Sequence, residues 1–303
     1  MPPDARAHFI VLADTHYHPA APKDFAPPKL LTRAPEILAA TVPAVNALSP
    51  EFIIHVGDLL CGGGSFDLTP KQYEHSLQDV AATYAGFDAP LHCVPGNHDC
   101  DAQQYRFGDF ARTFGTPGIF DVVDVAPRLR LARAHIFRDG EAGGGTWTDA
   151  LDEALRAADA EARSESTVLL LMLHSWVHAG VGAPDKGIIT NAAQLQTTLA
   201  ECPAVAATFS GHRHTNRVRL FRDYVCIDTA CLIGYPLGFR QITITDDGWL
   251  TSRWHTIDLP EILATSSQLA DEEHNHRWEG EVGDRDTTVV LPRARSTWSP
   301  SGS

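Results

Sequence analysis

The chain has 303 residues and a formal net charge of −14 at pH 7, and 44% of its residues are hydrophobic. This composition is typical of a soluble globular protein with one large α/β domain or two small ones. The negative charge argues against general binders of nucleic acid polymers or membrane surfaces, and no apolar run approaches the ~18 residues of a transmembrane helix.

The N-terminus and the cysteines indicate the compartment. An acid, Asp4, comes early and a predicted strand follows at once, which is not typical of a signal peptide. The six cysteines contain no C-x-x-C pair, so we expect reduced thiols. Both features favour a cytoplasmic protein.

Five short apolar runs are predicted to be strands, and helical patterns lie between them. Each run has four to eight mostly apolar residues, which fits strands that are covered on both faces. The runs are 8–14, 51–58, 90–99, 167–174 and 204–212. This alternation of strands and helices predicts an α/β fold.

Three helical patterns carry N-terminal signals. Residues 69–84 begin with Thr69 and residues 191–201 with Asn191, each followed three residues later by a glutamine, as in a capping box. Residues 146–162 carry acids in their first turn.

A fourth helical pattern, residues 35–48, contains Pro43. A proline inside a helix removes a backbone hydrogen bond and clashes with the preceding turn. We therefore expect Pro43 to kink or end this helix.

The pattern changes after residue 214. Residues 216–233 and 238–257 alternate like antiparallel strands, and the Asp-Asp-Gly at 246–248 is a hairpin turn signal. This part of the chain predicts a meander rather than further strand–helix units.

From about Leu259 onward the chain is polar. We predict a domain over residues 1–259 and a polar C-terminal arm or tail over residues 260–303, partly ordered at best. Because every candidate ligand named below precedes this arm, we expect it to be dispensable for metal binding.

Every predicted buried strand ends in a potential metal ligand. In open α/β sheets, ligands bind beyond the carboxyl ends of the strands, so five strand ends point polar groups at a common crevice. The candidate ligands are Asp14, His16, Asp58, Asn97, His174, His212 and His214.

This set of carboxylates, imidazoles and one amide suits Zn, Mn, Fe or Co rather than Ca or Mg alone. Seven ligands suit two ions if one carboxylate bridges them. Taken singly, Asp14 or Asp58 could be a turn residue and His174 a buried core histidine, but their joint occurrence at strand ends favours a metal site. A bound metal also makes an acidic protein compatible with an anionic substrate.

The motifs D-x-H, GD, GNHD, H and GHxH occur in an order that closely resembles the calcineurin-like metallophosphoesterase family, over roughly residues 8–256. The resemblance implies a four-layer α/β/β/α sandwich of two mixed sheets flanked by helices. Within the family, the chain looks most like bacterial class III cyclic-nucleotide phosphodiesterases and glycerophosphodiesterases. It is less similar to purple acid phosphatases, which have a tyrosine ligand where this chain has Cys61.

The resemblance also implies roles for the candidate residues. It implies two divalent or trivalent ions, of Mn, Fe or Zn, with Asp58 bound to both. One ion would be held by Asp14, His16, Asp58 and His214, and the other by Asp58, Asn97, His174 and His212. His98 would contact the substrate phosphate or the leaving group without binding metal.

We therefore expect hydrolysis of a small phosphodiester, a cyclic nucleotide or a glycerophosphodiester, by a metal-bridging hydroxide with His98 assisting the leaving group. His18 and His178 lie near ligands in the sequence and are candidate substrate-binding residues. The alternative is a phosphomonoesterase or nucleotide pyrophosphatase on the same metal centre. A remote alternative is a non-catalytic protein-binding scaffold. The expected partner is a small phosphoester, and members of this family often form homodimers.

Overall fold

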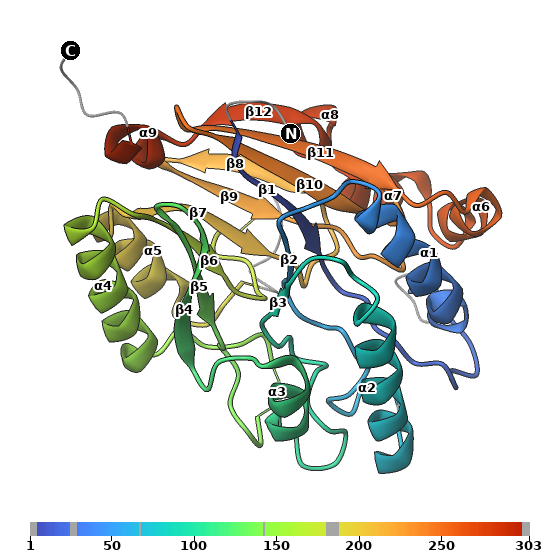
Figure 1. The fold of residues 1–303 in the computed structure, drawn as a ribbon. Coiled ribbons are helices and arrows are strands. Elements are labelled where there is room, and N and C mark those ends of the chain that lie inside the picture. Colours follow the sequence, from blue (N-terminus) through green and yellow to red (C-terminus); the bar gives the residue numbers. More distant parts are fainter. Residues whose placement is uncertain (1–4, 25–28, 67, 142, 180–187, 299–303) are drawn as a thin grey trace.

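Two six-stranded sheets lie at the centre of the molecule, and helices cover their outer faces (Figure 1). The computed structural model describes residues 5–24, 29–66, 68–141, 143–179 and 188–298. This arrangement confirms the predicted α/β sandwich of two mixed sheets.

The first sheet has the strand order β12-β11-β10-β1-β2-β3. Its strands are β1 (Ala5–Leu12), β2 (Phe52–His55), β3 (Leu91–Cys93), β10 (Gly238–Thr245), β11 (Trp249–Thr256) and β12 (Thr287–Val290). Strands β1, β2 and β3 are parallel, whereas β10, β11 and β12 add antiparallel neighbours beside β1.

The second sheet has the strand order β4-β5-β6-β7-β9-β8. Its strands are β4 (Phe120–Ala126), β5 (Leu129–Ala134), β6 (Val168–Met172), β7 (Val205–Ser210), β8 (Arg217–Phe221) and β9 (Tyr224–Asp228). Strands β5, β6, β7 and β9 are parallel, and both edge strands are antiparallel to their neighbours.

Alternate residues of each central strand pack against different layers, as the period of a strand requires. In β1, Phe9 faces the opposite sheet, where its ring centroid lies 5.6 Å from that of Phe209 in β7, and it stacks at 4.6 Å on Phe52 of the neighbouring strand β2. Ile10 and Leu12 instead pack against the helices. Burial on both faces explains why these strands are continuous apolar runs in the sequence.

The helices divide between the two sheets (Figure 1). The first sheet is covered by η1 (Leu31–Arg33), α1 (Ala34–Asn46) and α2 (Pro70–Tyr84), and the second by α4 (Asp149–Ser164) and α5 (Ala192–Glu201). The short helix α3 (Gly108–Phe114) lies beside α2. Among the residues described, no helix combines the length and apolarity that a membrane span needs.

Two helices differ in detail from the sequence expectations. Pro43 does not end α1, which continues to Asn46, because Ile37 and Val45 on either side of it are both fully buried against the sheet. Asn191 precedes α5 but does not cap it, since its side chain donates a hydrogen bond to the carbonyl of Trp147 instead. Thr69, by contrast, forms the predicted capping box.

Strands β4 and β5 were not indicated by the sequence pattern. Charged residues interrupt their apolar alternation, and these charges form cross-strand pairs. Asp121 lies opposite Arg133 and Asp124 lies opposite Arg130, and both pairs are bridged by hydrogen bonds. Opposite charges at facing positions stabilise an antiparallel pair of strands. The charged residues that interrupt the apolar alternation therefore stabilise the pairing of β4 with β5.

The C-terminal segment adds α6 (Pro260–Gln268), α7 (Glu272–Glu279), α8 (Val282–Arg285), β12 and α9 (Pro292–Trp298). Strand β12 pairs with β11. Leu291, Ala294 and Trp298 join the core between the sheets. The sequence suggested a partly ordered arm because most of its residues are polar. On these contacts we propose that the segment belongs to the same folding unit as the sheets.

Arg293 provides a test of that proposal. Its buried guanidinium donates hydrogen bonds to the carbonyls of Cys202 and Val205 at the start of β7. Arg293→Met should lower the free energy of unfolding in urea by at least about 2 kcal/mol, because a buried unsatisfied acceptor costs about 1–3 kcal/mol. The exposed Arg253→Met is the matched control. Equal stability of the two variants would mean that the segment is an appended arm.

Candidate metal centre

The candidate ligands gather at the carboxyl ends of the parallel strands. The backbone of Asp14 donates to the carbonyl of Gly57 at 3.0 Å, and that of His16 donates to the carbonyl of Asp58 at 2.9 Å. Thus the pairing of β1 with β2 continues past the strand ends and holds these ligands side by side. Strands β6 and β7 bring His174 and the loop from residue 211 to 214 to the same edge.

Three groups of side chains have nitrogen and oxygen atoms within 4.8 Å of one another. They are Asp14, His16 and His214; Asp58, His174 and His212; and His16, Asp58 and His98. These groups contain six of the seven predicted ligands, drawn from positions as far apart as 14 and 214.

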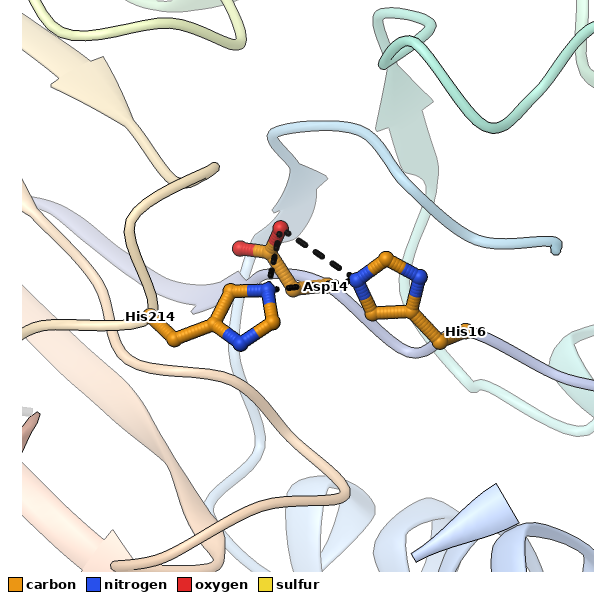
Figure 2. A group of neighbouring side chains, drawn as sticks. All are labelled: Asp14, His16 and His214. Carbon is orange, nitrogen blue, oxygen red and sulfur yellow. Dashed lines mark hydrogen bonds and ion pairs between the residues drawn. The ribbon is translucent and has the colours of Figure 1, made fainter. Parts of the chain in front are cut away.

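The first group is shown in Figure 2. His214 Nε2 lies 3.4 Å from Asp14 Oδ1 and 3.2 Å from His16 Nε2, and His16 Nε2 lies 3.8 Å from the same carboxylate oxygen. Two imidazole nitrogens and a carboxylate therefore converge on one point in a buried environment.

The second group meets the first at Asp58. His174 Nε2 lies 3.2 Å from Asp58 Oδ2 and 3.2 Å from His212 Nδ1. The same oxygen, Asp58 Oδ2, lies 3.7 Å from His16 Nε2 of the first group. Asp58 therefore lies between the two groups of candidate ligands.

Backbone contacts fix the orientation of these side chains. The Nδ1–H of His174 donates to the carbonyl of Val56 at 2.8 Å, which orients the ring so that Nε2 faces Asp58 and His212. Asp58 Oδ1 accepts from the backbone of His98 at 2.8 Å, and both oxygens of Asp14 accept from the backbone of His212.

Asp99 joins the loops that follow β2 and β3. Its carboxylate accepts from the backbone N–H groups of Asp58, Leu60 and Gly96 at 2.8 to 2.9 Å. A side chain at Gly96 would collide with the carboxylate of Asp58, so this loop can approach only without one. The motif GNHD thus contributes Asn97 as a candidate ligand, and its Asp99 also holds the loop that carries Asp58.

Five of the candidate ligands have left-handed backbone conformations, with φ between 44° and 68°. They are Asp14, His16, Asp58, His212 and His214. Such conformations cost non-glycine residues about 1–3 kcal/mol each and cluster at functional sites. The fold tolerates this strain where the backbone turns ligands inward.

The surroundings set the charge of the site. Burial lowers the pKa of His16 and of His212 well below the usual value, so both rings are neutral. Burial alone would raise the pKa of Asp58, but His174 and His98 outweigh it and hold the pKa well below the usual value. Burial would lower the pKa of His174, but the Asp58 carboxylate outweighs it and raises this pKa to about 9. His174 is therefore protonated at neutral pH and must lose that proton to bind a metal ion.

The side-chain oxygen of Asn97 bears on whether the site is suited to metal ions. This oxygen is buried and has no hydrogen-bond partner within the part of the chain that the structure describes, and the residue directly precedes His98 of the third group. A buried amide oxygen without a partner costs free energy that a cation would recover. Together with the nitrogen and carboxylate donors, it forms a set suited to transition-metal ions.

The two predicted substrate-binding histidines lie in different surroundings. His18 is buried close to His16 in the chain, and its Nδ1 has no hydrogen-bond partner among the described residues. His178 bonds to the hydroxyl of Tyr224 at 2.8 Å, and its ring stacks on Phe221 with centroids 3.8 Å apart. His178 therefore packs on the edge of the second sheet and belongs to none of the three ligand groups.

An aromatic ring and a cation beside the site were not among the predicted site residues. The ring of Phe66 lies 5.0 Å from His98 and 5.9 Å from His16, and the ammonium of Lys29 lies 5.2 Å from the Phe66 centroid. Lys29 lies in a basic, proline-rich stretch of the sequence, which was its only signal.

Buried polar groups behind the site were also missed. Cys61 and Cys231 donate S–H bonds to the carbonyls of His16 and Asp14, respectively. The hydroxyl of Thr15, between those two ligands, lies 2.7 Å from both His55 Nε2 and the hydroxyl of Tyr84. Such supporting contacts depend on three-dimensional packing and leave no motif in the sequence.

Comparison with known proteins assigns the family. Residues 7–216 match the model of the calcineurin-like phosphoesterases, and the chain belongs to this family. It is a metal-dependent phosphoesterase of a dimetal-dependent family.

The chain is similar to one relative in sequence and to two solved structures in fold. The chain is 27% identical, over 84% of its length and 91% of the relative, to the 3′,5′-cyclic adenosine monophosphate phosphodiesterase CpdA of Escherichia coli. Its fold is similar to that of a dimetal phosphatase from Danio rerio, with a TM-score of 0.72, 14% identity and coverage of 95% and 100% of the two chains. It also resembles GAP50, an anchor in the inner membrane complex of Plasmodium, with a TM-score of 0.51, 13% identity and coverage of 86% and 87%.

Metal content should distinguish Asp58 from the other ligands. After reconstitution with Mn²⁺, elemental analysis should give about two ions per chain for the unaltered protein and about one for Asn97→Ala. Asp58→Ala should retain fewer ions than Asn97→Ala. Activity of Asp58→Ala should fall by more than ~10³-fold, because both positions lose a ligand. The exposed Asp88→Ala is the control. Two firmly bound ions in Asp58→Ala would show that another carboxylate is shared.

Proposed function

We propose that this protein hydrolyses a small phosphodiester, a cyclic nucleotide or a glycerophosphodiester, with two transition-metal ions. The observation that carries the proposal is the pair of ligand groups that meet at Asp58, with His98 next to the junction. The similarity to a bacterial cyclic-nucleotide phosphodiesterase over nearly its whole length supports this substrate class.

The ligands divide into two sets in this proposal. Asp14, His16 and His214 would hold one ion, and His174, His212 and Asn97 the other, with Asp58 shared by both. When bound, ions of Mn, Fe or Zn would neutralise phosphate oxygens and lower the pKa of the attacking water.

His98 is the side chain placed to act on the substrate. Its Nδ1–H donates to the carbonyl of Gly62 at 2.9 Å, and its backbone N–H is bound to Asp58. These contacts fix the ring and leave Nε2 for the substrate. Because Nδ1 keeps its own proton, Nε2 can donate to a leaving oxygen only when the ring is protonated.

A panel of substrates tests the proposed activity. Bis(p-nitrophenyl) phosphate, p-nitrophenyl phosphate, cyclic AMP and a nucleoside diphosphate compound should each be assayed with Mn²⁺, Fe²⁺ and Zn²⁺. The proposal requires turnover of a diester. Exclusive turnover of the monoester or of the pyrophosphate would assign the centre to a phosphomonoesterase or pyrophosphatase. Inactivity of the fully loaded protein would favour a scaffold.

The loss of activity on substitution of His98 should depend on the leaving group of the substrate. An alkoxide needs a proton to leave, whereas nitrophenolate leaves readily without one, and general acid catalysis is typically worth ~10²–10⁴-fold. We expect His98→Ala to retain both ions, to lose activity by that factor on an alkyl diester, and to lose distinctly less on bis(p-nitrophenyl) phosphate.

The exposed His75→Ala, on the outside of α2, is the matched control. Equal losses of His98→Ala on both diesters would assign His98 to stabilisation of the phosphate. Loss of an ion in this variant would instead make His98 a ligand.

A further inference from the structure

Thr15 lies between two candidate ligands, Asp14 and His16. The side chains of both converge with that of His214 (Figure 2). Both ligands have left-handed backbone conformations, with φ of 53° and 44°. Residues other than glycine rarely adopt such angles, so this turn persists only where the surrounding structure holds it. The contacts of Thr15 therefore bear on how the first ligand group is kept in place.

One hydroxyl group connects this turn to the core of the domain. Thr15 Oγ1 lies 2.7 Å from His55 Nε2 and 2.7 Å from the hydroxyl of Tyr84. All three side chains are buried, so bulk water has no access to these contacts. His55 is the last residue of β2 and Tyr84 is the last residue of α2. Two elements of the fold therefore fix one side chain.

A third contact sets the direction of the bond between His55 and Thr15. The backbone N–H of Gly57 donates to His55 Nδ1 at 3.2 Å, so Nε2 carries the ring proton and donates to Thr15. Burial lowers the pKa of His55 to about 3, which keeps the ring neutral with this single proton. The contact therefore requires an acceptor oxygen at position 15, and a valine would leave the buried N–H without a partner.

The turn around Thr15 has weaker support elsewhere than the turn that carries Asp58. The backbone N–H of Asp58 is bound at 2.8 Å to the carboxylate of Asp99. The carbonyls on either side of Thr15 accept only S–H bonds from the side chains of Cys61 and Cys231, and thiols are weak donors. Loss of the Thr15 hydroxyl should therefore disturb its own turn more than that of Asp58.

We propose that Thr15 is a positioning residue of the metal centre, whose hydroxyl keeps Asp14 and His16 turned toward one ion. The inference rests on the proposed two-ion function and deepens it, because a residue that touches neither ion nor substrate sets the affinity for one of the two ions. The ion assigned to His174 and His212 should depend much less on Thr15.

Metal titration by calorimetry tests this role. Thr15→Val keeps the shape of the side chain and removes its hydroxyl, whereas Thr15→Ser keeps the hydroxyl. In Thr15→Val we expect the dissociation constant of one Mn²⁺ ion to rise about 10- to 100-fold, as is typical when a side chain that supports a metal ligand is lost. The other ion should bind almost unchanged, and Thr15→Ser should bind both ions as the unaltered protein does.

A second substitution identifies the affected ion. Asn97→Ala should keep only the ion held by Asp14 and His16, so adding Thr15→Val to this variant should weaken the single remaining ion by the same factor. Activity offers a further readout, because activity that Thr15→Val loses at limiting Mn²⁺ should return when Mn²⁺ is raised.

Thr41→Val is the matched control. It removes an equally buried hydroxyl, which donates to the carbonyl of Ile37 within α1, and it should bind both ions normally.

Unchanged affinity in Thr15→Val would overturn the proposal, as would equal weakening of both ions. A Thr15→Ser variant as weak as Thr15→Val would also overturn it, because packing rather than the hydroxyl would then matter. If Thr15→Val does not fold, Tyr84→Phe removes only the partner hydroxyl and should weaken the same ion, and unchanged binding there would contradict the proposal. A protein that binds both ions but hydrolyses no phosphoester would contradict the proposed function, and the titration would still decide on Thr15.

Discussion

The carboxylate of Asp58 is buried among imidazole rings, and much of the surrounding structure keeps it there. Its Oδ1 is held by the backbone of His98, and its own backbone N–H is held by Asp99. A buried carboxylate is costly unless positive charge compensates it. Because two ligand groups meet at this carboxylate, a single residue couples the first sheet to histidines from the second.

The sandwich architecture makes this coupling feasible. Parallel strands in both sheets end at the same edge, so short loops from β1, β2, β6 and β7 carry ligands toward one point. The strands themselves are anchored by apolar packing on both faces, as in Phe9 against Phe209 and Ile10 against the helices. That rigidity allows several ligands to adopt strained left-handed conformations, which a loosely packed loop would not maintain.

The sequence predicted the site better than its surroundings. Strand-end residues such as Asp14 and Asp58 follow apolar runs whose burial is local in the sequence, so their convergence follows from the rules for parallel sheets. Features that depend on distant packing were missed. Pro43 remains helical because the sheet buries its neighbours. The charged residues of β4 interrupt its apolar pattern, and only their pairing with Arg130 and Arg133 of β5 explains why this segment is a strand.

The C-terminal segment shows the same limit. Its polar composition indicated an arm, because composition does not reveal that Trp298 reaches the core between the sheets or that Trp278 meets Asn216.

We propose that two ions share the carboxylate of Asp58, and electron paramagnetic resonance of the Mn²⁺-loaded protein can decide whether they do. A shared carboxylate brings the ions close enough for their spins to couple. As Mn²⁺ is added up to two equivalents, we expect the multiline spectrum of an exchange-coupled pair of ions. A full complement of two ions that gives only the six-line signal of isolated Mn²⁺ would contradict it.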